Sequence, residues 1–398
     1  MPVQSPSLRR PAIAFIFVTG VLDVMAMGLV TPVLPSLIEE FAGSTADAGW
    51  WNGVLIALWA GAQFVCSPIL GSLSDRFGRR PVILVSTAGL AIDWALMALA
   101  PNLWWLALGR LVGGITSSSF TAIFAYMADI TTPEQRARGY GIVGAAFSLG
   151  FIAGPALGGV LGEWGPRVPF WVASALSALA FVYGWRILPE SLPPERRMPF
   201  AWSRANPVGS LRLLRSHPEL SGLAVVNLLL YFAHHVFTAV FVLYAQHRYG
   251  FGPFEVGLML ALAGLLEMGV QGALVGKVVD RLGDRRTMVV GFAFGTAGLW
   301  LMGFAPTGLI FVLALVPNSL WALAQPTLLS LMTRRVSERE QGQLQGANNS
   351  VASIAGVFSP LFFGWVYSQS TGSSGISFYI AAVILSLAAL LGLVTGRK

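Results

Sequence analysis

Long apolar stretches, each of roughly 20 residues, alternate with short polar connections along the chain. That length is what an α-helix needs to cross the hydrocarbon core of a bilayer. Because lipid offers no hydrogen-bond partners, a spanning segment satisfies its own backbone as a helix. The pattern predicts an all-α membrane protein with twelve transmembrane helices, over residues 12–36, 48–72, 81–100, 103–128, 138–162, 168–188, 220–246, 254–279, 287–305, 308–332, 343–368 and 375–396.

One polar connection, residues 189–219, is longer than the others and is rich in proline and arginine. Such a composition is typical of a linker. It divides the chain into an N-terminal six-helix bundle at residues 1–188 and a C-terminal six-helix bundle at residues 220–398.

The two predicted bundles repeat each other. The hairpin Gly71–Arg80 returns in altered form as Gly276–Arg286. Two similar bundles with a pathway between them are the architecture expected of an alternating-access carrier. Identical residues recur at a spacing of 205 positions in the pairs Gly71/Gly276, Asp75/Asp280, Gly141/Gly346, Pro155/Pro360 and Gly159/Gly364.

The basic residues lie on one side of the predicted membrane. Of the 25 lysines and arginines, 22 lie in the termini, in the even-numbered loops or at the ends of spans next to those loops, and the exceptions are Arg110, Arg167 and Arg248. Cytoplasmic loops carry such an excess of positive charge. We therefore expect both termini and the central linker to be cytoplasmic, and the first apolar segment to be a retained helix rather than a removed signal.

Composition narrows the functional classes. The chain is 55% hydrophobic and 11% charged, with a mean hydropathy of +0.69, so it needs a lipid bilayer around it. The net charge of +7 lies in short loops, which argues against a nucleic-acid partner. The single cysteine, Cys66, excludes disulfides within the chain and multi-cysteine metal sites. We expect no metal site and no cofactor.

The first hairpin combines a turn with charge. Gly78 permits a tight turn, and Asp75 is expected to accept hydrogen bonds from a helix N-terminus or to pair with an arginine of its own loop. The hairpin resembles the signature of the major facilitator superfamily. The resemblance implies a cytoplasmic gate that contains Gly71, Asp75, Arg76, Gly78, Arg79 and Arg80. For Arg80, a topology-setting positive charge remains the alternative.

The fifth predicted span contains closely spaced glycines around a proline. Glycines let another helix approach, and a proline bends its own helix. The pattern is similar to the glycine-proline motif of drug/proton antiporters in the same superfamily, which favours export; a generic helix-packing patch is the alternative. Its fixed positions are Gly141, Gly150, Gly154, Pro155, Gly158 and Gly159, of which Gly154 and Pro155 are expected to take part in gating.

Three charged residues lie within apolar spans of the first half: Arg110, Asp23 and Asp93. A charge in a span is costly unless it is paired or hydrated, so the aspartates are the expected partners of Arg110. A carboxylate that exchanges its proton beside an arginine is a plausible proton-coupling element. A purely structural ion pair is the alternative.

The resemblance extends along nearly the whole chain to the tetracycline/proton antiporters. It rests on Leu22-Asp23, Thr31 to Pro35, Ala128 to Thr131, Leu188 to Ser191 and Gln341 to Gly346, together with the motifs above. It implies that Asp23 and Asp93 serve substrate or proton. It also implies that Gln63 and Gln271 line the pathway, although ordinary interhelical hydrogen bonds remain their alternative role. Asp75, Arg79, Arg110 and Asp129 would form the gating network.

The second half departs from that family. Where the tetracycline exporters have a histidine in the eighth span this chain has Glu267, and where they have an aspartate in the ninth it has Gly295. We expect Glu267 to take over proton exchange with His235 as partner, because a Glu–His pair can titrate near neutral pH. Packing is the alternative for His235 and His234. The changes leave open whether tetracycline is carried.

Trp59 and Phe237 lie at mid-span and are the aromatic residues expected to line a broad apolar cavity, with His235, Gln63 and Gln271 as further substrate-binding residues. The sequence has no phosphate loop, no nucleophile with a base and no metal-ligand cluster, so we do not expect an enzyme.

We therefore predict a monomeric carrier of the bacterial inner membrane. It would export an amphiphilic, drug-like small molecule in exchange for protons through Asp23, Asp93, Glu267 and Arg110. Two alternatives remain open. One is a proton-coupled carrier of a sugar or small metabolite, and the other is a transporter-like receptor or scaffold without flux.

Overall fold

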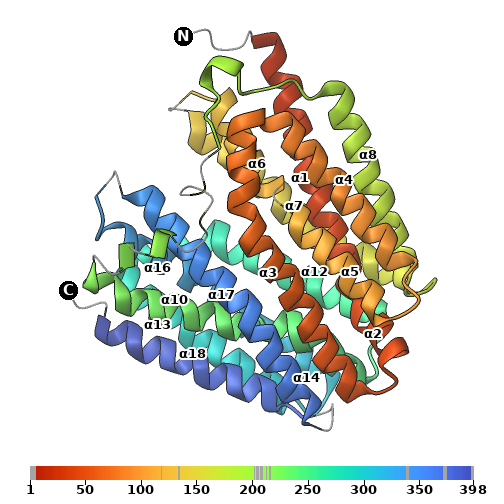
Figure 1. The fold of residues 1–398 in the computed structure, drawn as a ribbon. Helices are drawn as coiled ribbons and strands as arrows, with labels where there is room; N and C mark the ends of the chain where they lie inside the picture. Colours follow the sequence, from red (N-terminus) through yellow and green to blue (C-terminus); the bar gives the residue numbers. More distant parts are fainter. Residues whose placement is uncertain are drawn as a thin grey trace. The chain divides into compact units, whose positions relative to one another are not determined.

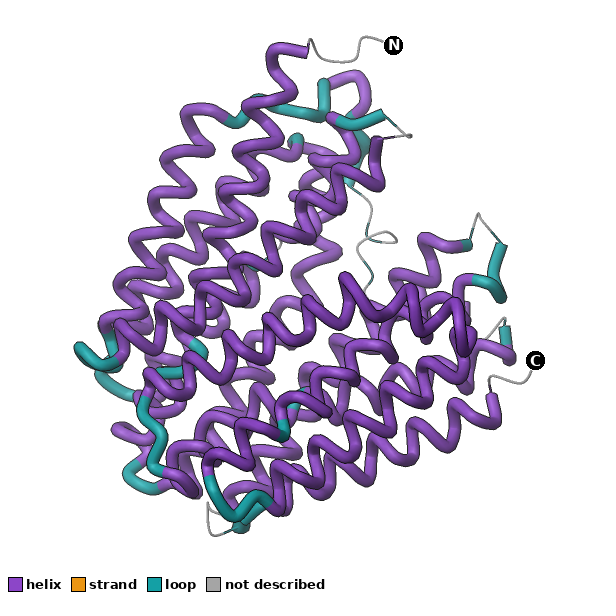
Figure 2. The backbone as a smooth tube through the Cα atoms, turned by 180° about the vertical axis from the view of Figure 1, so that it is seen from behind, coloured by secondary structure: helices purple, strands orange, loops and turns teal. Residues whose placement is uncertain are grey.

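The computed structural model describes residues 6–117, 119–132, 135–200, 202, 206, 209–211, 213–214, 217–337, 340–370 and 374–395. Over these residues the chain is helical and contains no β-strand (Figure 2). The all-α prediction is therefore confirmed. Several residues of the predicted linker, including Arg204, Pro207, Arg212 and Arg215, lie outside the described part of the chain.

The helices of the first half are α1 (Pro6–Val30), α2 (Leu34–Ala42), α3 (Thr45–Phe77), α4 (Arg79–Ala98), α5 (Leu103–Thr116), α6 (Ser119–Ile130), α7 (Arg136–Gly162) and α8 (Val168–Ile187). Two short 3₁₀ turns, η2 (Pro194–Arg196) and η3 (Gly209–Leu211), follow in the linker.

The second half contains α10 (Pro218–His234), the π-helical segment η4 (Phe237–Phe241), α11 (Val242–Tyr249), α12 (Pro253–Gly269), the π-helical segment η5 (Val270–Leu274), α13 (Val275–Phe304), α14 (Gly308–Leu313), α15 (Leu315–Ser319), the 3₁₀ segment η6 (Leu320–Leu323), α16 (Ala324–Thr333), α17 (Gln341–Ser368) and α18 (Ile376–Thr395).

Ten helical stretches of the described chain are long and apolar enough to cross a membrane, whereas the sequence predicts twelve spans. The helix of the fourth predicted span is too short to be counted, because α5 ends at Thr116 and Ser117 leaves the helical conformation with a ψ of 37°. The eighth and ninth spans join into one stretch, Pro253–Phe304, which is interrupted at Gly283 by a φ of +74°. The spans therefore correspond, and local backbone geometry explains the different count.

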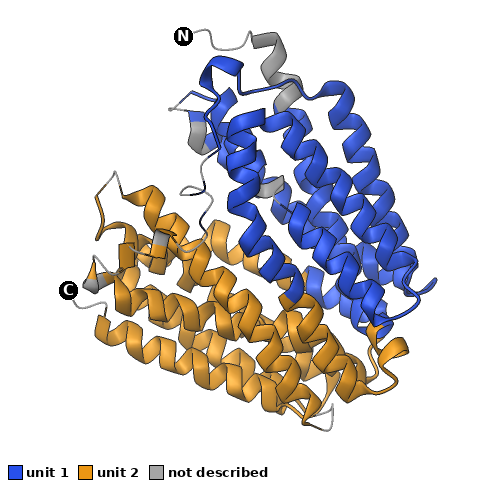
Figure 3. Ribbon diagram, in the orientation of Figure 1, with its two compact units in different colours: residues 1–37, 58–207, 253–261 blue, residues 38–57, 208–252, 262–398 orange. Residues whose placement is uncertain are grey.

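Two compact units make up the chain (Figure 3). Unit 1 contains residues 1–37, 58–207 and 253–261, and unit 2 contains residues 38–57, 208–252 and 262–398. Each unit thus includes a segment from the other half of the sequence. Helices α3 and α12 each begin in one unit and continue into the other.

Unit 1 is built around α1 and α4. Helix α1 packs against α7 and α8, and α4 packs against α5 and α8 (Figure 1). One apolar cluster, which includes Ile83, Tyr126 and Val143, is buried beneath the hairpin that joins α3 to α4. Burial of these side chains fixes the helices that carry the hairpin.

In unit 2, α13 packs against α16 and α18, while α10 packs against α17 and α18 (Figure 1). Aromatic rings fill the end of the bundle near α11: Tyr244 lies 4.9 Å from Phe378 and 5.6 Å from Phe311 between ring centroids. Such ring pairs stabilise a fold by more than the burial of their apolar area alone.

Two segments pack with the unit formed mainly by the other half of the sequence: residues 38–57 with unit 2 and residues 253–261 with unit 1. We call them the exchanged segments, and close glycine contacts attach each one to its unit. In unit 1, a Cβ on Gly257 at the start of α12 would overlap the carbonyl oxygen of Pro155 in α7. In unit 2, a Cβ on Gly53 at the start of α3 would overlap the carbonyl oxygen of Pro360 in α17. Because Pro155 and Pro360 are repeat-related, the same backbone-to-backbone packing occurs once in each unit.

These contacts predict that Gly257→Ala destabilises the purified protein by about 1–3 kcal/mol, since the new methyl group meets backbone that cannot move aside. Gly269→Ala, in the same helix, is the matched control because no atom lies within 4 Å of its Cβ position. Thermal unfolding in detergent measures both variants. Equal unfolding midpoints would contradict the packing argument.

Candidate functional site

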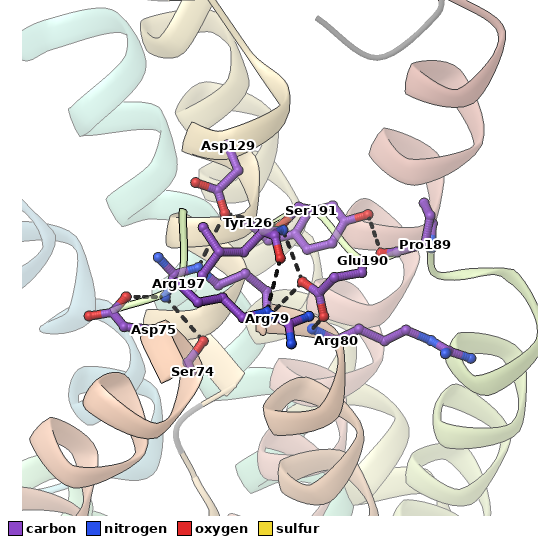
Figure 4. A network of polar contacts seen from close by, with 11 residues as sticks. Ser74, Asp75, Arg79, Arg80, Tyr126, Asp129, Pro189, Glu190, Ser191 and Arg197 are labelled. Atoms are coloured by element: carbon purple, nitrogen blue, oxygen red, sulfur yellow. Dashed lines mark hydrogen bonds and ion pairs between the residues drawn. The ribbon is translucent and has the colours of Figure 1, made fainter. Parts of the chain in front are cut away.

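The hairpin between α3 and α4 forms a charged network inside unit 1 (Figure 4). The guanidinium of Arg79 is at its centre: Nη1 lies 2.7 Å from Asp75 Oδ1, and Nε lies 3.2 Å from Asp129 Oδ2. Nη1 also donates to the hydroxyl of Ser74 at 3.1 Å, and Ser191 donates to Asp129 at 3.0 Å. Arg79 therefore connects α3, α4 and α6. Of the two roles expected for Asp75, the structure shows the ion pair.

A residue without an assigned role in the sequence analysis, Glu190, completes this network. Its carboxylate accepts the backbone N–H groups of Arg79 at 2.8 Å and Arg80 at 3.3 Å, which are the first residues of α4. A carboxylate at a helix N-terminus satisfies unpaired donors and opposes the positive end of the helix dipole. An acid is especially favourable here because α4 begins with two arginines, whose positive charges add to the positive end of the helix dipole.

Gly78 is required at this turn for two reasons. Its φ is +106°, a conformation that side chains disfavour, and a Cβ there would overlap the Glu190 carboxylate. The glycine of the hairpin thus leaves the space in which the capping acid lies.

The segment that follows α8 covers the hairpin. Tyr126 donates its hydroxyl to the carbonyl of Pro189 at 2.9 Å, and the N–H of Met198 donates to the carbonyl of Asp75 at 3.0 Å. Residues 188–198 therefore bind both α3 and α6, and they are part of the site rather than only a linker.

The remaining hairpin residues are less constrained. Arg80 donates to the carbonyl of Trp185 at 2.6 Å, whereas the exposed Arg76 lies over the ring of Phe77 at 5.0 Å. Gly71 has open space at its Cβ position. The packing in the described structure gives no reason for a glycine at this position.

The second hairpin forms the same ion pair with its charges exchanged. Asp284 and Arg334 stand 205 positions after Arg79 and Asp129, and Nη2 of Arg334 lies 2.8 Å from Asp284 Oδ2. Ser330 donates to the same oxygen at 3.0 Å. Like Gly78, Gly283 has a positive φ, here +74°. Both repeats therefore have an ion pair at this position, but the acidic and basic residues are exchanged between the two positions. We call the second pair the inverted bridge.

A second polar site lies within the apolar part of unit 1. Arg110 Nη2 lies 3.4 Å from Asp93 Oδ2, Asp93 is fully buried, and the guanidinium stacks 4.8 Å from the ring of Trp94. Glycines permit this approach, since a Cβ on Gly109 or Gly113 would contact Asp93 at 3.0 Å or closer. The expected pairing of Arg110 with Asp93 is thus present.

Four other predicted residues lie in unit 1. Asp23 is 1% exposed in α1, and Gln63 donates to the carbonyl of Ser117 at 3.4 Å. Trp59 is partly buried, and a Cβ on Gly154 would overlap the backbone of Met25 and Gly28. Gly154 is therefore a close-contact residue between α7 and α1.

Unit 2 contains an aromatic group where regular α-helix is interrupted. The ring of His234 lies 5.8 Å from Phe237 and 5.5 Å from Trp321, which belong to η4 and η6. On the same helix as His234, Tyr231 accepts a 2.6 Å hydrogen bond from Gln325. The π-helical segment η5, which contains Gln271, packs against η6. Irregular turns of this kind are frequent at functional sites.

Glu267 and His235 do not form the expected pair. Within the described residues no ion pair joins them, and His235 Nδ1 instead lies 2.7 Å from the carbonyl of Tyr231, one helical turn earlier. Glu267 is partly buried near the end of α12. In the part of the chain that the structure describes, no three His, Cys, Asp or Glu side chains group as a metal ion would need.

The capping geometry predicts that Glu190→Ala destabilises the protein by about 1 kcal/mol through loss of the α4 cap. Glu195→Ala, an exposed acid of the same segment, is the control and should leave stability unchanged. Chemical or thermal unfolding of the purified chain measures both. A loss of the same size in the two variants would contradict the capping role.

The inverted bridge predicts a reversible charge exchange. Arg334→Asp places two carboxylates together and should lower the unfolding midpoint, while the double variant Asp284→Arg/Arg334→Asp should recover most of the loss because it recreates the arrangement of Arg79 and Asp129. A double-mutant cycle measures the coupling, expected at about 1 kcal/mol. Additive losses would contradict direct pairing.

Comparison with known proteins identifies the family. The sequence model of the Major Facilitator Superfamily matches residues 16–360 and, in a second alignment, residues 268–397. The class C tetracycline resistance protein of Escherichia coli is 36% identical over 374 residues, which cover 94% of each chain. The class G protein of Vibrio anguillarum is 36% identical over 390 residues, covering 96% of this chain and 97% of that relative.

A solved structure supports the same fold. The crystal structure of the nucleoside transporter NupG matches with a TM-score of 0.81 at 12% sequence identity, covering 97% of this chain and 99% of NupG. This likeness concerns the fold alone. Taken with the two repeat-related hairpins, the family match shows that the chain is a multi-pass membrane transporter and belongs to the Major Facilitator Superfamily.

Proposed function

We propose that the chain exports an amphiphilic, drug-like molecule from the bacterial cytoplasm in exchange for protons. The observation that carries the proposal is the buried Asp93–Arg110 pair, a carboxylate and a guanidinium held within the apolar part of unit 1. Intramembrane acids of this kind mark substrate or proton pathways in transporters. The names of the relatives, which are resistance proteins for tetracycline, support a drug as the exported molecule.

The pair suits proton exchange. A carboxylate in an apolar site loses hydration when it is charged, whereas the nearby guanidinium favours its charged form. Small movements of Arg110 relative to Asp93 would therefore change whether Asp93 holds a proton. Asp23 and Glu267 are the further proton-exchanging acids of the proposal, both in apolar helices.

The substrate side of the proposal lies in unit 2. His234, Phe237 and Trp321 offer aromatic faces, while Tyr231 and Gln325 offer hydrogen-bonding groups nearby. Faces and polar groups together suit an amphiphilic molecule with planar rings. His235, which lies between α10 and η4, and Gln271, which lies in η5, belong to this proposed surface. In unit 1, Trp59 and Gln63 are the further substrate-binding residues of the proposal.

In the proposed function the protein is a monomer in a bacterial inner membrane. Both termini and residues 189–219 face the cytoplasm of a bacterial inner membrane, because the basic residues gather on that side. The protein acts as a monomer that needs no cofactor, catalyses no covalent reaction and meets only lipid, substrate and protons. The hairpin network of Asp75, Arg79 and Asp129 gates its cytoplasmic side.

The proposal predicts that Asp93→Asn lowers proton-driven transport by about tenfold or more, because the amide cannot exchange a proton. Asp23→Asn and Glu267→Gln should have the same effect. Asp47→Asn, an exposed acid hydrogen-bonded to Ser44, is the control and should transport at the wild-type rate. Drug-induced proton movement in inverted membrane vesicles measures all four.

Wild-type rates in all three buried variants would contradict the proton-coupling assignment. An ionophore that collapses the proton gradient should also raise drug accumulation in expressing cells. Running a panel of drugs with and without a divalent metal ion would separate metal-chelating tetracyclines from other amphiphiles.

A further inference from the structure

A cluster of four residues of unit 2, which none of the sequence motifs contains, joins four helices. Glu39 lies in α2, Thr45 begins α3, and His247 and Tyr367 lie near the ends of α11 and α17. His247 Nε2 lies 2.9 Å from Glu39 Oε1 and 2.9 Å from the Thr45 hydroxyl oxygen. The Tyr367 hydroxyl lies 3.2 Å from His247 Nδ1. All four residues are partly or fully buried.

The contacts of His247 determine where its hydrogens must lie. Nδ1 lies 2.7 Å from the carbonyl oxygen of Leu243, which only accepts hydrogen bonds, so Nδ1 carries a hydrogen. In the neutral ring that leaves Nε2 with a bare lone pair, aimed at Glu39. Thr45 has one hydroxyl hydrogen, which it donates to Glu39 Oε1 at 2.9 Å, and so it cannot serve both acceptors.

One additional proton is therefore needed between Glu39 and His247. At 2.9 Å, an uncharged Nε2 and an ionised carboxylate would oppose two lone pairs, which is repulsive. A single proton removes the conflict, either as an imidazolium donating to a carboxylate or as a carboxylic acid donating to an imidazole. Without it, the contact is lost.

The surrounding charges do not provide that proton. Arg248 directs Nη2 to the carbonyl of Ala305 at 3.2 Å and stacks on Tyr244 and Tyr249. Asp47 accepts from the Ser44 hydroxyl at 2.7 Å, and Glu40 is exposed beside Glu39 on α2. The Tyr367 hydroxyl is a further titratable group, in contact with His247 at Nδ1. Glu39 is the carboxylate that faces His247.

We propose that Glu39 and His247 form a binding site for one proton, and that this proton holds residues 38–57 in unit 2. The location of the site rests on the topology of the proposed function. Because Glu39 follows the first predicted span, the site faces the outside of the membrane in that topology. Helix α3 continues from unit 2 into unit 1, so any motion that carries residues 38–57 away with unit 1 must break the proton-held contact. External protons then favour the attached state.

Hydrogen exchange on the purified full chain tests the site without requiring transport. Backbone exchange of residues 38–45 is measured at about pH 5.5 and about pH 9, on either side of the range in which histidine changes charge, with correction for intrinsic rates. In the wild type we expect exchange at least about tenfold slower, after correction, at the acidic pH.

Two amide variants should abolish this dependence. In Glu39→Gln the new amide donates to the neutral Nε2, and in His247→Gln the new amide donates to the Glu39 carboxylate, so both keep the contact at either pH. His217→Gln is the control, because His217 also faces an acid, Glu340 at 3.6 Å, but outside the cluster. Hydrogen bonds from Ser337 hold the pKa of Glu340 below its ordinary value. This variant should behave as the wild type.

A wild-type segment without slower exchange at acidic pH overturns the proposal, and so does retention of the wild-type pH dependence in both amide variants. Because the measurement reads backbone opening, it distinguishes failure of this site from failure of proton-coupled export. In Asp93→Asn, which is expected to lose transport, backbone exchange of residues 38–45 should keep the pH dependence of the wild type.

Discussion

The low dielectric of the bilayer is the constraint on which the rest of this structure depends. A charged side chain within an apolar helix bundle costs free energy unless it is hydrated or pairs with a group on another helix. Arg110 meets Asp93 in this way within unit 1. This pair joins α5 to α4, so electrostatics contributes to the packing of these two helices. Glycines at positions 109 and 113 then serve the pair by letting the backbones approach.

The repeat of 205 residues accounts for the equivalent hairpins of the two units, and each hairpin forms an ion pair at the same position. Arg79 with Asp129 and Asp284 with Arg334 are opposite in sign but equivalent in position. A single replacement would leave two like charges facing each other, so the exchange requires compensating changes at both positions. Both hairpins have this ion pair, and the first is in addition capped by Glu190, which accepts the N–H of Arg79.

Hydropathy and charge were sufficient for the fold, because spans and their order depend on local sequence. The pairing of Arg110 with Asp93 was also predictable, since charges within spans are few and need partners. Glu190, however, lies 2.8 Å from the N–H of a residue 111 positions earlier, and only helix packing brings them together. The available signal was indirect: a helix that begins with Arg79 and Arg80 needs an acid at its N-terminus. The predicted contact between Glu267 and His235 is not formed in the described structure, because spacing along the chain does not reveal that His235 hydrogen-bonds to its own helix.

The exchanged segments connect proton binding to movement. Residues 38–57 belong to unit 2 through glycine contacts and hydrogen bonds, such as the amide of Asn52 donating to the carbonyl of Ala239 at 2.8 Å. Residues 253–261 belong to unit 1 through glycine contacts with α7. The two attachments are built alike at the glycines, and each also contains a carboxylate: Glu39 faces His247 in the first, and Glu163 accepts the N–H of Phe254 at 3.3 Å in the second. The direct contact between a carboxylate and an imidazole belongs to the first. Under the proposed proton site, external acidity strengthens the attachment of residues 38–57 to unit 2, which favours the conformations that keep this attachment.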